Sequence, residues 1–314
     1  MNESLQQLTL QAIGAEGIDR IEVVQSLWSG YGEIARLSLK GGDYPTLIAK
    51  AISLPEQVTH PRGWHSDFSH QRKIRSYQVE KHWYQYWSQR CNANCRVAEC
   101  YLATGDEQQS LILLEDLDFH GYHIRKSQLN LNDAKRCLKW LASFHATFLH
   151  ATPNGLWPVG SYWHLATRPD ELQAMEEGAL KQHAAEIDAQ LNSGKYQTLI
   201  HGDAKVANFC FHENGDDVAA VDFQYVGRGC GMRDVAYFIG SCLSEDECQQ
   251  WQEPLLDYYF SQLKSYLADS ESDFDILEQE WRWRYPLAWA DFQRFLMGWM
   301  PTHQKINHYT DSMV

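Results

Sequence analysis

The first third of the chain alternates between short apolar runs and turns that carry glycine, which is the pattern of a small antiparallel sheet. Apolar runs cover 23–27 and 34–39 on either side of Ser29-Gly30-Tyr31-Gly32, and a third run covers 45–52. Runs of this length bounded by Gly and Asp are typical of strands joined by turns. The pattern therefore predicts three consecutive strands.

A long helix and a buried strand follow in the sequence. The segment 70–90 carries Trp83, Tyr84 and Trp87 on one face at helical spacing. Residues 111–114 are four large apolar residues in a row, which predicts a buried strand. We expect a hinge between two parts of the chain in the acidic stretch directly after that strand.

The rest of the chain is mostly helical in pattern. A helix is expected at 133–149, with Asn132 or Asp133 as its N-cap, and a second from about 170 to 191. One face of the first helix carries Leu138, Leu141, His145 and Phe148. From 232 onward the pattern indicates helices rich in aromatic residues.

Short strands interrupt these helices. A strand is expected at 198–200, and 209–211 should pair with 218–221 as a hairpin. The turn between the last two contains Asn214-Gly215, a strong signal for a tight hairpin.

Composition and charge narrow the classes of function. Hydrophobic residues make up 44% of the 314 residues and charged residues 22%, which excludes a disordered or fibrous chain. The 41 Asp and Glu against 27 Lys and Arg give a net charge of −14, a field that repels nucleic acid and anionic membranes. The N-terminus has no secretory signal pattern, and no apolar run is long enough to span a bilayer. We expect a cytoplasmic protein that binds neither nucleic acid nor membrane; the oligomeric state cannot be read from the sequence.

Eight cysteines raise the question of a metal site. Cys91, Cys95 and Cys100 are close together, but they lack the two-residue spacing and the second ligand pair of a zinc finger. Buried or solvent-facing free thiols are the simpler interpretation.

The segment His201 to Asn208 carries the most informative chemistry. Asp203 and Asn208 lie five positions apart, and Asp222, followed by Phe223, comes fourteen positions after Asn208. Phosphoryl transfer needs an acceptor for a hydroxyl proton and side chains that hold Mg²⁺, and kinase-type sites use this spacing. The hairpin between Asn208 and Asp222 would bring both metal ligands together.

Candidate phosphate-binding groups lie in the first third. Ser29-Gly30-Tyr31-Gly32 and Ala35 form a Gly-x-Gly-x-x-Ala pattern between two strands, although glycines also serve ordinary hairpins. Lys50 lies on a strand that should be buried, and Glu80 lies on the aromatic face of the helix. A buried lysine requires an anion, so we expect a Lys50–Glu80 pair that presents Lys50 to the α- and β-phosphates of ATP. The alternative is that both side chains reach solvent separately.

These motifs together resemble the small-molecule kinases of the protein-kinase-like superfamily. The similarity is greatest to the choline kinase-like and ecdysteroid kinase-like group, beside the aminoglycoside phosphotransferases. The matching pieces, in family order, are Leu47-Ile48-Ala49-Lys50, Glu80-Lys81-His82-Trp83-Tyr84, Leu113-Leu114-Glu115-Asp116-Leu117, Leu141-Ala142-Ser143-Phe144-His145-Ala146, His201-Gly202-Asp203 through Asn208-Phe209, Val221-Asp222-Phe223-Gln224 and Arg233-Asp234-Val235-Ala236-Tyr237-Phe238.

The resemblance implies an α+β, protein-kinase-like two-lobe fold. An N-terminal nucleotide-binding lobe of antiparallel sheet plus helix would cover 1–115. A mostly helical C-terminal lobe for catalysis and substrate binding would cover 116–314.

The resemblance also implies cofactors and roles. ATP would lie in the cleft, with the backbone of Glu115 and Leu117 bound to adenine. Asp203 would be the catalytic base, Asn208 and Asp222 the Mg²⁺ ligands, and Asp234 a structural residue that holds the catalytic loop.

Two positions depart from the family pattern. Many relatives have an aromatic residue or glutamine near position 205, where this chain has Lys205. By analogy with serine/threonine kinases we expect Lys205 to contact the transferred phosphate, the alternative being a solvated surface lysine. Ala35 replaces a third glycine, which leaves the geometry of the glycine turn open. We expect His145 and His201 to be structural.

The acceptor side is less specific. A stripe of large residues recurs every three or four positions: Trp281, Tyr285, Trp289, Phe292, Leu296 and Trp299. It fits a core-facing helix, or an aromatic acceptor pocket in which Asp291 or another acid faces a cation. The acceptor is therefore expected to be a small-molecule alcohol, either choline-like or a larger apolar or aminoglycoside-type compound.

Two other functions fit the sequence less well. A protein kinase is disfavoured, because the stretch between Gln224 and Arg233 is too short for an activation loop. A nucleotide-binding pseudokinase that acts as an interaction module is disfavoured because the charged site residues are all retained.

Overall fold

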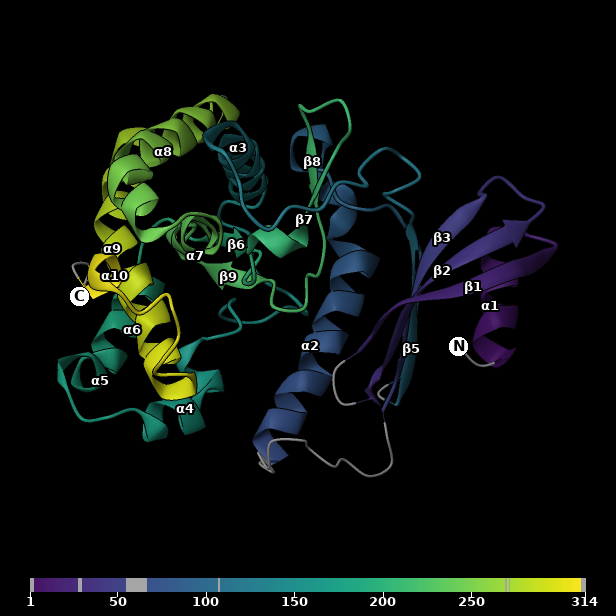
Figure 1. Ribbon diagram of the computed structural model, residues 1–314, viewed down its shortest axis with the longest axis horizontal. Coiled ribbons are helices and arrows are strands. Elements are labelled where there is room, and N and C mark those ends of the chain that lie inside the picture. The colour runs from purple at the N-terminus through teal and green to yellow at the C-terminus, as the bar shows by residue number, and fades with distance from the viewer. Residues whose placement is uncertain are drawn as a thin grey trace.

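A five-stranded antiparallel sheet and one long helix build the first lobe. The computed structural model describes residues 3–27, 30–54, 67–106, 108–268, 270 and 272–311. The strands are β1 (Gly17–Ser26), β2 (Gly32–Lys40), β3 (Thr46–Ser53), β4 (Cys100–Gly105) and β5 (Gln109–Glu115). Their order in the sheet is β1-β2-β3-β5-β4. We call this sheet with α1 (Glu3–Ile13) and α2 (Asp67–Tyr86) the N-terminal lobe (Figure 1).

The helix α2 lies between the sheet and the rest of the molecule (Figure 1). It contacts β4 and β5 on one side. On the other side the Trp83 ring stacks on Phe223 with 4.6 Å between centroids, and its edge meets Phe148. Trp83 is fully buried. The aromatic face expected from the sequence therefore joins the two lobes.

The C-terminal lobe comprises everything from α3 on and packs four long helices around two small sheets. The long helices are α3 (Leu131–Thr147), α7 (Met232–Cys242), α8 (Glu245–Tyr266) and α9 (Phe274–Trp299). The short strands are β6 (Thr198–Ile200), β7 (Phe209–Phe211), β8 (Val218–Ala220) and β9 (Gly227–Gly229). β7 pairs with β8 and β6 with β9, so the hairpin expected from Asn214-Gly215 is confirmed. The last helix of the described residues is α10 (His308–Asp311).

Several expectations about elements were wrong in detail. The single helix expected from 170 to 191 is three pieces, α4 (Pro169–Ala174), α5 (Ala179–Gln182) and α6 (Ala184–Asn192). Each piece packs separately on α9, and the extended backbone at Gly178 (φ 175°) interrupts the helix.

The N-cap of α3 also differs from the expectation. Asn130 caps the helix, and its side chain accepts a hydrogen bond from the Asp133 N–H at 2.9 Å. The Asp133 carboxylate instead forms ion pairs with Lys126 and Arg136 at 2.7 Å each. Two charged partners therefore bind the side chain that the sequence suggested as a cap.

No helix within the described ranges is both long enough and apolar enough to cross a membrane.

Candidate active site

The catalytic-loop candidate begins where β6 ends, and Asp234 at the start of α7 holds it. The Asp234 carboxylate accepts hydrogen bonds from the backbone N–H groups of His201 at 2.6 Å and Gly202 at 2.9 Å. His145 lies 3.2 Å from the same carboxylate and 2.7 Å from the Tyr259 hydroxyl, in the core. The expected structural roles of Asp234 and His145 agree with these contacts.

Gly202 is required by the close packing of this loop. Its φ is +79°, and a Cβ atom there would lie 2.2 Å from the carbonyl oxygen of Tyr225. Side chains rarely adopt this backbone conformation, and nothing larger than glycine fits the space. The loop is therefore fixed tightly against the segment that follows Asp222.

Asp203 lies on this loop, buried, with cationic and amide partners on one oxygen. The Lys205 ammonium is 3.0 Å from Oδ2, and the Asn208 amide nitrogen donates to Oδ2 at 3.1 Å and to the Asp203 carbonyl at 2.7 Å. Oδ1 accepts no hydrogen bond from any described residue. Burial raises the pKa of Asp203, and Lys205 opposes this rise only in part. A carboxylate with one unused oxygen and a raised pKa suits proton acceptance.

Asp222 lies beside Asn208, as the hairpin predicted. The N–H of Val221 donates to the Asn208 carbonyl at 3.0 Å. His201 completes the junction, because its Nε2 donates to the Val221 carbonyl at 3.0 Å while its Nδ1 accepts from the Asp203 N–H. Asp222 itself has a left-handed backbone (φ +70°), an uncommon conformation for a non-glycine residue that is enriched at functional sites.

Lys50 and Glu80 form the ion pair expected from the sequence. The Lys50 Nζ lies 2.5 Å from Glu80 Oε2 and 3.7 Å from Asp222 Oδ1, and both Lys50 and Glu80 are buried. Burial lowers the pKa of Lys50, but Glu80 and Asp222 outweigh it and hold the pKa above its ordinary value. The separate, solvent-facing alternative is therefore wrong.

The glycine turn closes tightly onto β3 and α2. Ser29 lies outside the described residues. Gly30 and Gly32 have positive φ, and a Cβ at Gly32 would lie 2.0 Å from the Ala51 carbonyl oxygen. The buried Tyr31 directs its hydroxyl to His70 of α2 at 2.7 Å, so backbone groups are what this turn can offer a phosphate.

The segment between the lobes offers a backbone donor at Leu117. The carboxylate of Glu115 is buried, and it accepts from Arg96 and from the Glu99 N–H at 2.9 Å. The Leu117 carbonyl accepts from the Tyr122 N–H at 2.9 Å, whereas the Leu117 N–H donates to no described residue. This free N–H is the group that an adenine ring needs at a kinase hinge.

Arg36 links the sheet to the segment between the lobes. This residue was not identified from the sequence. Its guanidinium binds Asp116 at 2.7 Å and Asp118 at 2.5 Å. Its position on β2 carries no motif, so only the fold brings it to the aspartates 80 and 82 positions away.

Lys73 of α2 was also missed. Its ammonium donates to Gln224 Oε1 at 2.9 Å and lies 4.6 Å from the Tyr77 ring centroid. Burial lowers its pKa to about 8, against an opposing effect of Asp222. In addition to Lys50 of β3, Lys73 of α2 thus places a second cation beside the segment that contains Asp222.

The aromatic stripe of α9 is mainly core. Trp281, Tyr285, Trp289, Phe292 and Leu296 are buried, whereas Trp299 is 39% exposed. The idea that Asp291 faces a cationic acceptor is wrong, because Asp291 is fully buried among arginines. Arg294 Nη2 lies 3.0 Å from its Oδ1 and Arg233 Nη2 lies 3.6 Å from its Oδ2.

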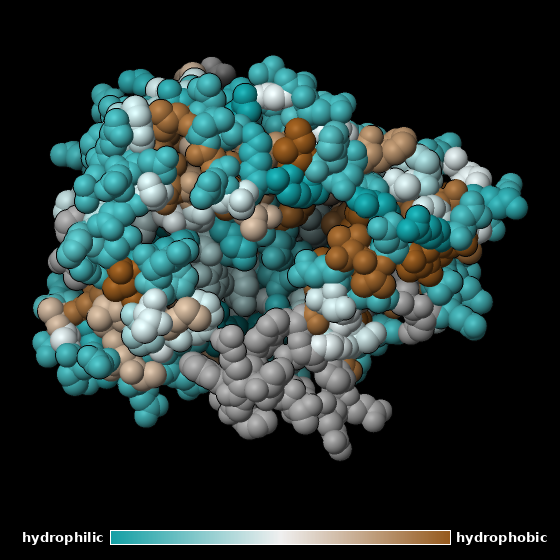
Figure 2. Space-filling model, in the orientation of Figure 1, coloured by the Kyte–Doolittle hydropathy of each residue, from teal (hydrophilic) through white to brown (hydrophobic). Residues whose placement is uncertain are grey.

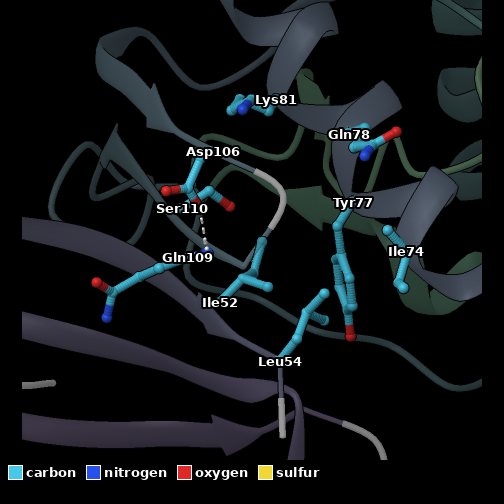
Figure 3. A pocket seen from close by; sticks show the side chains of 9 residues that line it. All are labelled: Ile52, Leu54, Ile74, Tyr77, Gln78, Lys81, Asp106, Gln109 and Ser110. Carbon is cyan, nitrogen blue, oxygen red and sulfur yellow. Dashed lines mark hydrogen bonds between the residues drawn. The ribbon is translucent and has the colours of Figure 1, made fainter. Parts of the chain in front are cut away.

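The surface is hollowed between the two lobes (Figure 2). A separate small pocket lies between α2 and the sheet, with Tyr77, Gln78 and Lys81 on one wall and Ile52 and Ser110 on the other (Figure 3). None of the site residues predicted from the sequence lines that pocket. The candidate chemistry lies instead where Lys50 of β3 approaches Asp222 of the C-terminal lobe.

The donor set fits a hard divalent cation. Asp222 Oδ1 accepts no hydrogen bond from any described residue, and the Asn208 amide nitrogen is directed to Asp203, which leaves the amide oxygen available. Mg²⁺ typically takes one or two such oxygens and completes its shell with phosphates and water. In the described ranges no cluster of three His, Cys, Asp or Glu side chains could hold a metal alone, and all eight cysteines are free thiols.

Solved structures with the same architecture are small-molecule kinases. An amicoumacin kinase in complex with AMP-PNP and Ca²⁺ aligns over 100% of this chain and 91% of its own, at 14% identity and a TM-score of 0.55. A macrolide 2′-phosphotransferase from Brachybacterium faecium aligns over 92% and 91%, at 13% identity and 0.52. A choline kinase from Streptococcus pneumoniae aligns over 99% and 96%, at 11% identity and 0.50. These matches show a protein-kinase-like fold, as expected.

Sequence comparison identifies the family directly. No curated protein matches the chain. The model of the ecdysteroid kinase-like family matches residues 74–152 and 160–271, which together are more than half of the chain. The matched ranges contain Glu80, Asp203, Asn208 and Asp222. The chain is therefore a member of the ecdysteroid kinase-like family.

Proposed function

We propose that the protein is an ATP- and Mg²⁺-dependent phosphotransferase that phosphorylates a hydroxyl group of a small molecule. The observation that carries the proposal is the convergence of Asp203, Asn208 and Asp222 with the buried Lys50–Glu80 pair. Asp203 and Asp222 each keep a buried oxygen without a hydrogen-bond donor among the described residues. These oxygens are suited to a hydroxyl proton and to a metal ion.

In the proposed reaction the acceptor oxygen bonds to the γ-phosphorus of ATP while the bond from that phosphorus to the β–γ bridging oxygen breaks. The hydroxyl proton passes to the free oxygen of Asp203, and ADP leaves with the electron pair of the broken bond. Lys50 holds the α- and β-phosphates, and Lys205 neutralises charge on the transferred group. Mg²⁺ held by Asn208 and Asp222 would neutralise charge on the phosphates.

Nucleotide binding is proposed for the hollow between the lobes. The free N–H of Leu117 and the carbonyl of Glu115 would hold adenine, and the turn from Ser29 to Gly32 would cover the phosphates. The proposed lobes are 1–115 and 116–314. The chemistry fits the cytoplasm, where ATP is available and free thiols stay reduced.

The test is ADP release with Mg-ATP over a panel of amino alcohols, sterols, sugars and aminoglycosides, with Asp203→Asn as the matched control. Release that requires both an alcohol and Asp203 would support the proposal. A pseudokinase would bind nucleotide but release no ADP with any alcohol beyond the Asp203→Asn background.

A further inference from the structure

Tyrosine side chains pack beside the loop that carries Asp203, and we call this group the wall. The N–H of Tyr162 donates to the Gly202 carbonyl at 3.1 Å, which places Tyr162 against the catalytic loop. Its ring lies 5.9 Å from Tyr225 and 5.6 Å from Tyr237. Burial raises the pKa of Tyr237 well above its ordinary value, and the nearby Asp203 carboxylate adds to the rise. An acceptor that reaches Asp203 would therefore contact phenol rings.

Lys305 adds a cation to this wall. Its ammonium lies 5.2 Å from the Tyr237 ring centroid and 5.7 Å from that of Phe292. Burial lowers the pKa of Lys305 to about 8, and the nearby Cys242 and Asp203 side chains oppose this effect. Within the described part of the chain, no carboxylate lies within 4.0 Å of this ammonium. A half-buried ammonium with no counter-ion among the described residues favours an anionic ligand.

The acidic residues around the wall are paired with other cations. Asp291 is paired with Arg294 and Arg233, as described above, and Glu171 lies 3.0 Å from Arg168. Arg168 also lies 5.1 Å from the Phe295 ring centroid, at the far side of Tyr162. Glu171 and Asp291 are thus paired with arginines, whereas no carboxylate of the described residues forms an ion pair with Lys305.

We propose that the acceptor of this enzyme is an alcohol with an apolar or aromatic body that carries an anionic group such as a carboxylate, and that Lys305 selects it. The proposal rests on the phosphotransferase function proposed above and narrows its substrate class. The partly buried ring of Tyr162 contacts the body, and the ammonium of Lys305 binds the anion. Quaternary ammonium alcohols and polycationic aminoglycosides are then disfavoured by like charge.

Three matched probes test this selection. They are 4-(hydroxymethyl)benzoate, 1,4-benzenedimethanol and 4-(hydroxymethyl)benzylamine, which share a ring and a primary hydroxyl and differ in charge. Affinity is measured directly by ligand-observed NMR on the full-length protein, and phosphorylation is measured with Mg-ATP. We expect the wild type to prefer the benzoate over the benzylamine by about ten- to a hundredfold, the range of a charge-assisted hydrogen bond.

Lys305→Met should abolish the preference for the anion, and Lys305→Arg should retain most of it. The control Lys139→Met removes the same charge from an exposed position on α3 and should leave the preference unchanged. Equal or better binding of the benzylamine by the wild type would overturn the proposal, as would an unchanged preference in Lys305→Met. A rise in the KM for ATP without a change in probe preference would make Lys305 a nucleotide ligand and would also overturn it.

The same measurements distinguish a failure of the proposed phosphotransferase function from a failure of the proposed charge preference. A failure of the phosphotransferase function would appear as no stabilisation by Mg-ATP and no phosphorylation of any alcohol, measured on the same wild-type sample. The NMR affinities do not need turnover, so they decide the charge preference of the wall in either case.

Discussion

The Lys50 ammonium and the Glu80 carboxylate meet at 2.5 Å inside the N-terminal lobe, and Asp222 of the C-terminal lobe lies 3.7 Å from the same ammonium. One lysine therefore contacts the acidic groups of both lobes. These contacts give Lys50 a role in the stability of the fold, which can be measured separately from its proposed role in binding the phosphates of ATP.

Removing one partner of this pair should destabilise the fold more than removing both. Lys50→Met leaves Glu80 buried without a cation, and we expect a loss of about 3–5 kcal/mol in the free energy of unfolding. The double variant Lys50→Met/Glu80→Met should lose less than Lys50→Met alone, and so less than the sum of the two single variants. Urea unfolding of the four proteins measures the coupling. Strict additivity would show that the two side chains do not depend on each other.

Nucleotide binding should stabilise the protein in a Mg²⁺-dependent way. At about a hundred times its dissociation constant, Mg-ATP should add ~2.7 kcal/mol to the free energy of unfolding. Asn208→Ala and Asp222→Ala should remove the part that depends on Mg²⁺, because each deletes one proposed ligand. Thermal unfolding with ATP, with and without EDTA, measures the effect. An unchanged melting temperature over millimolar Mg-ATP would contradict nucleotide binding in the hollow.

Asp203 and Lys205 should be separable by kinetics. Asp203→Asn removes the proton acceptor, and we expect turnover to fall by roughly 10²–10⁴ with little change in ATP affinity. Lys205→Ala should lower turnover and also weaken ATP binding, because the ammonium contacts the transferred phosphate. The experiment compares turnover and the ATP dissociation constant for both variants. Near-full turnover of Asp203→Asn, with chemistry rate-limiting, would refute the assignment of the base.

Asp234→Asn should disturb the catalytic loop, although Asp234 is not one of the residues proposed to bind a substrate. The fully buried carboxylate accepts two backbone N–H groups, and an amide nitrogen in its place would face those donors. We expect a loss of about 1–3 kcal/mol in the free energy of unfolding together with lower turnover. The control Asp275→Asn changes a side chain that is 86% exposed and should have little effect. Equal unfolding midpoints for the two variants would argue against a holding role.

Binding of an anionic acceptor should weaken as pH rises through about 8. Burial lowers the pKa of Lys305 to that value, with Cys242 of α7, Cys248 of α8 and Asp203 opposing the effect and Lys205 adding to it. Below pH 8 the ammonium is charged and attracts the anion; above it the charge is lost. In the free protein the lowered pKa means that the charged form opposes folding in full below pH 8, and this penalty disappears progressively between pH 8 and the ordinary lysine pKa of 10.5. Affinity of 4-(hydroxymethyl)benzoate between pH 6 and 10 should show this loss in the wild type and not in Lys305→Met.

The sequence was sufficient for the parts of the site that depend on local spacing. The turn at Asn214-Gly215 fixes the length of the hairpin, so the spacing alone predicts that Asp222 lies beside Asn208. The pairing of Lys50 with Glu80 followed from two charges on otherwise apolar faces. In the first case the length of one hairpin determines where the side chain lies. In the second case the periodicity of the strand and of the helix determines the direction of each side chain.

Positions that depend on packing between distant elements could not be predicted. β4 (Cys100–Gly105) has no clear alternation, and its pairing with β5 defines it. Lys305 lies on an irregular segment 102 positions beyond Asp203, where neither a motif nor a period indicates its direction. Asp291 was misjudged because the arginines that neutralise it come partly from α7, and only the contact of α7 with α9 reveals them.

Arg36 restrains the segment that connects the two lobes. By binding Asp116 and Asp118 it locks strand β2 to the first residues beyond β5, so sheet and connecting segment should turn as one rigid body. Any rotation between the sheet and the C-terminal lobe would then take place after Asp118, and the backbone proposed to hold adenine would move with the sheet.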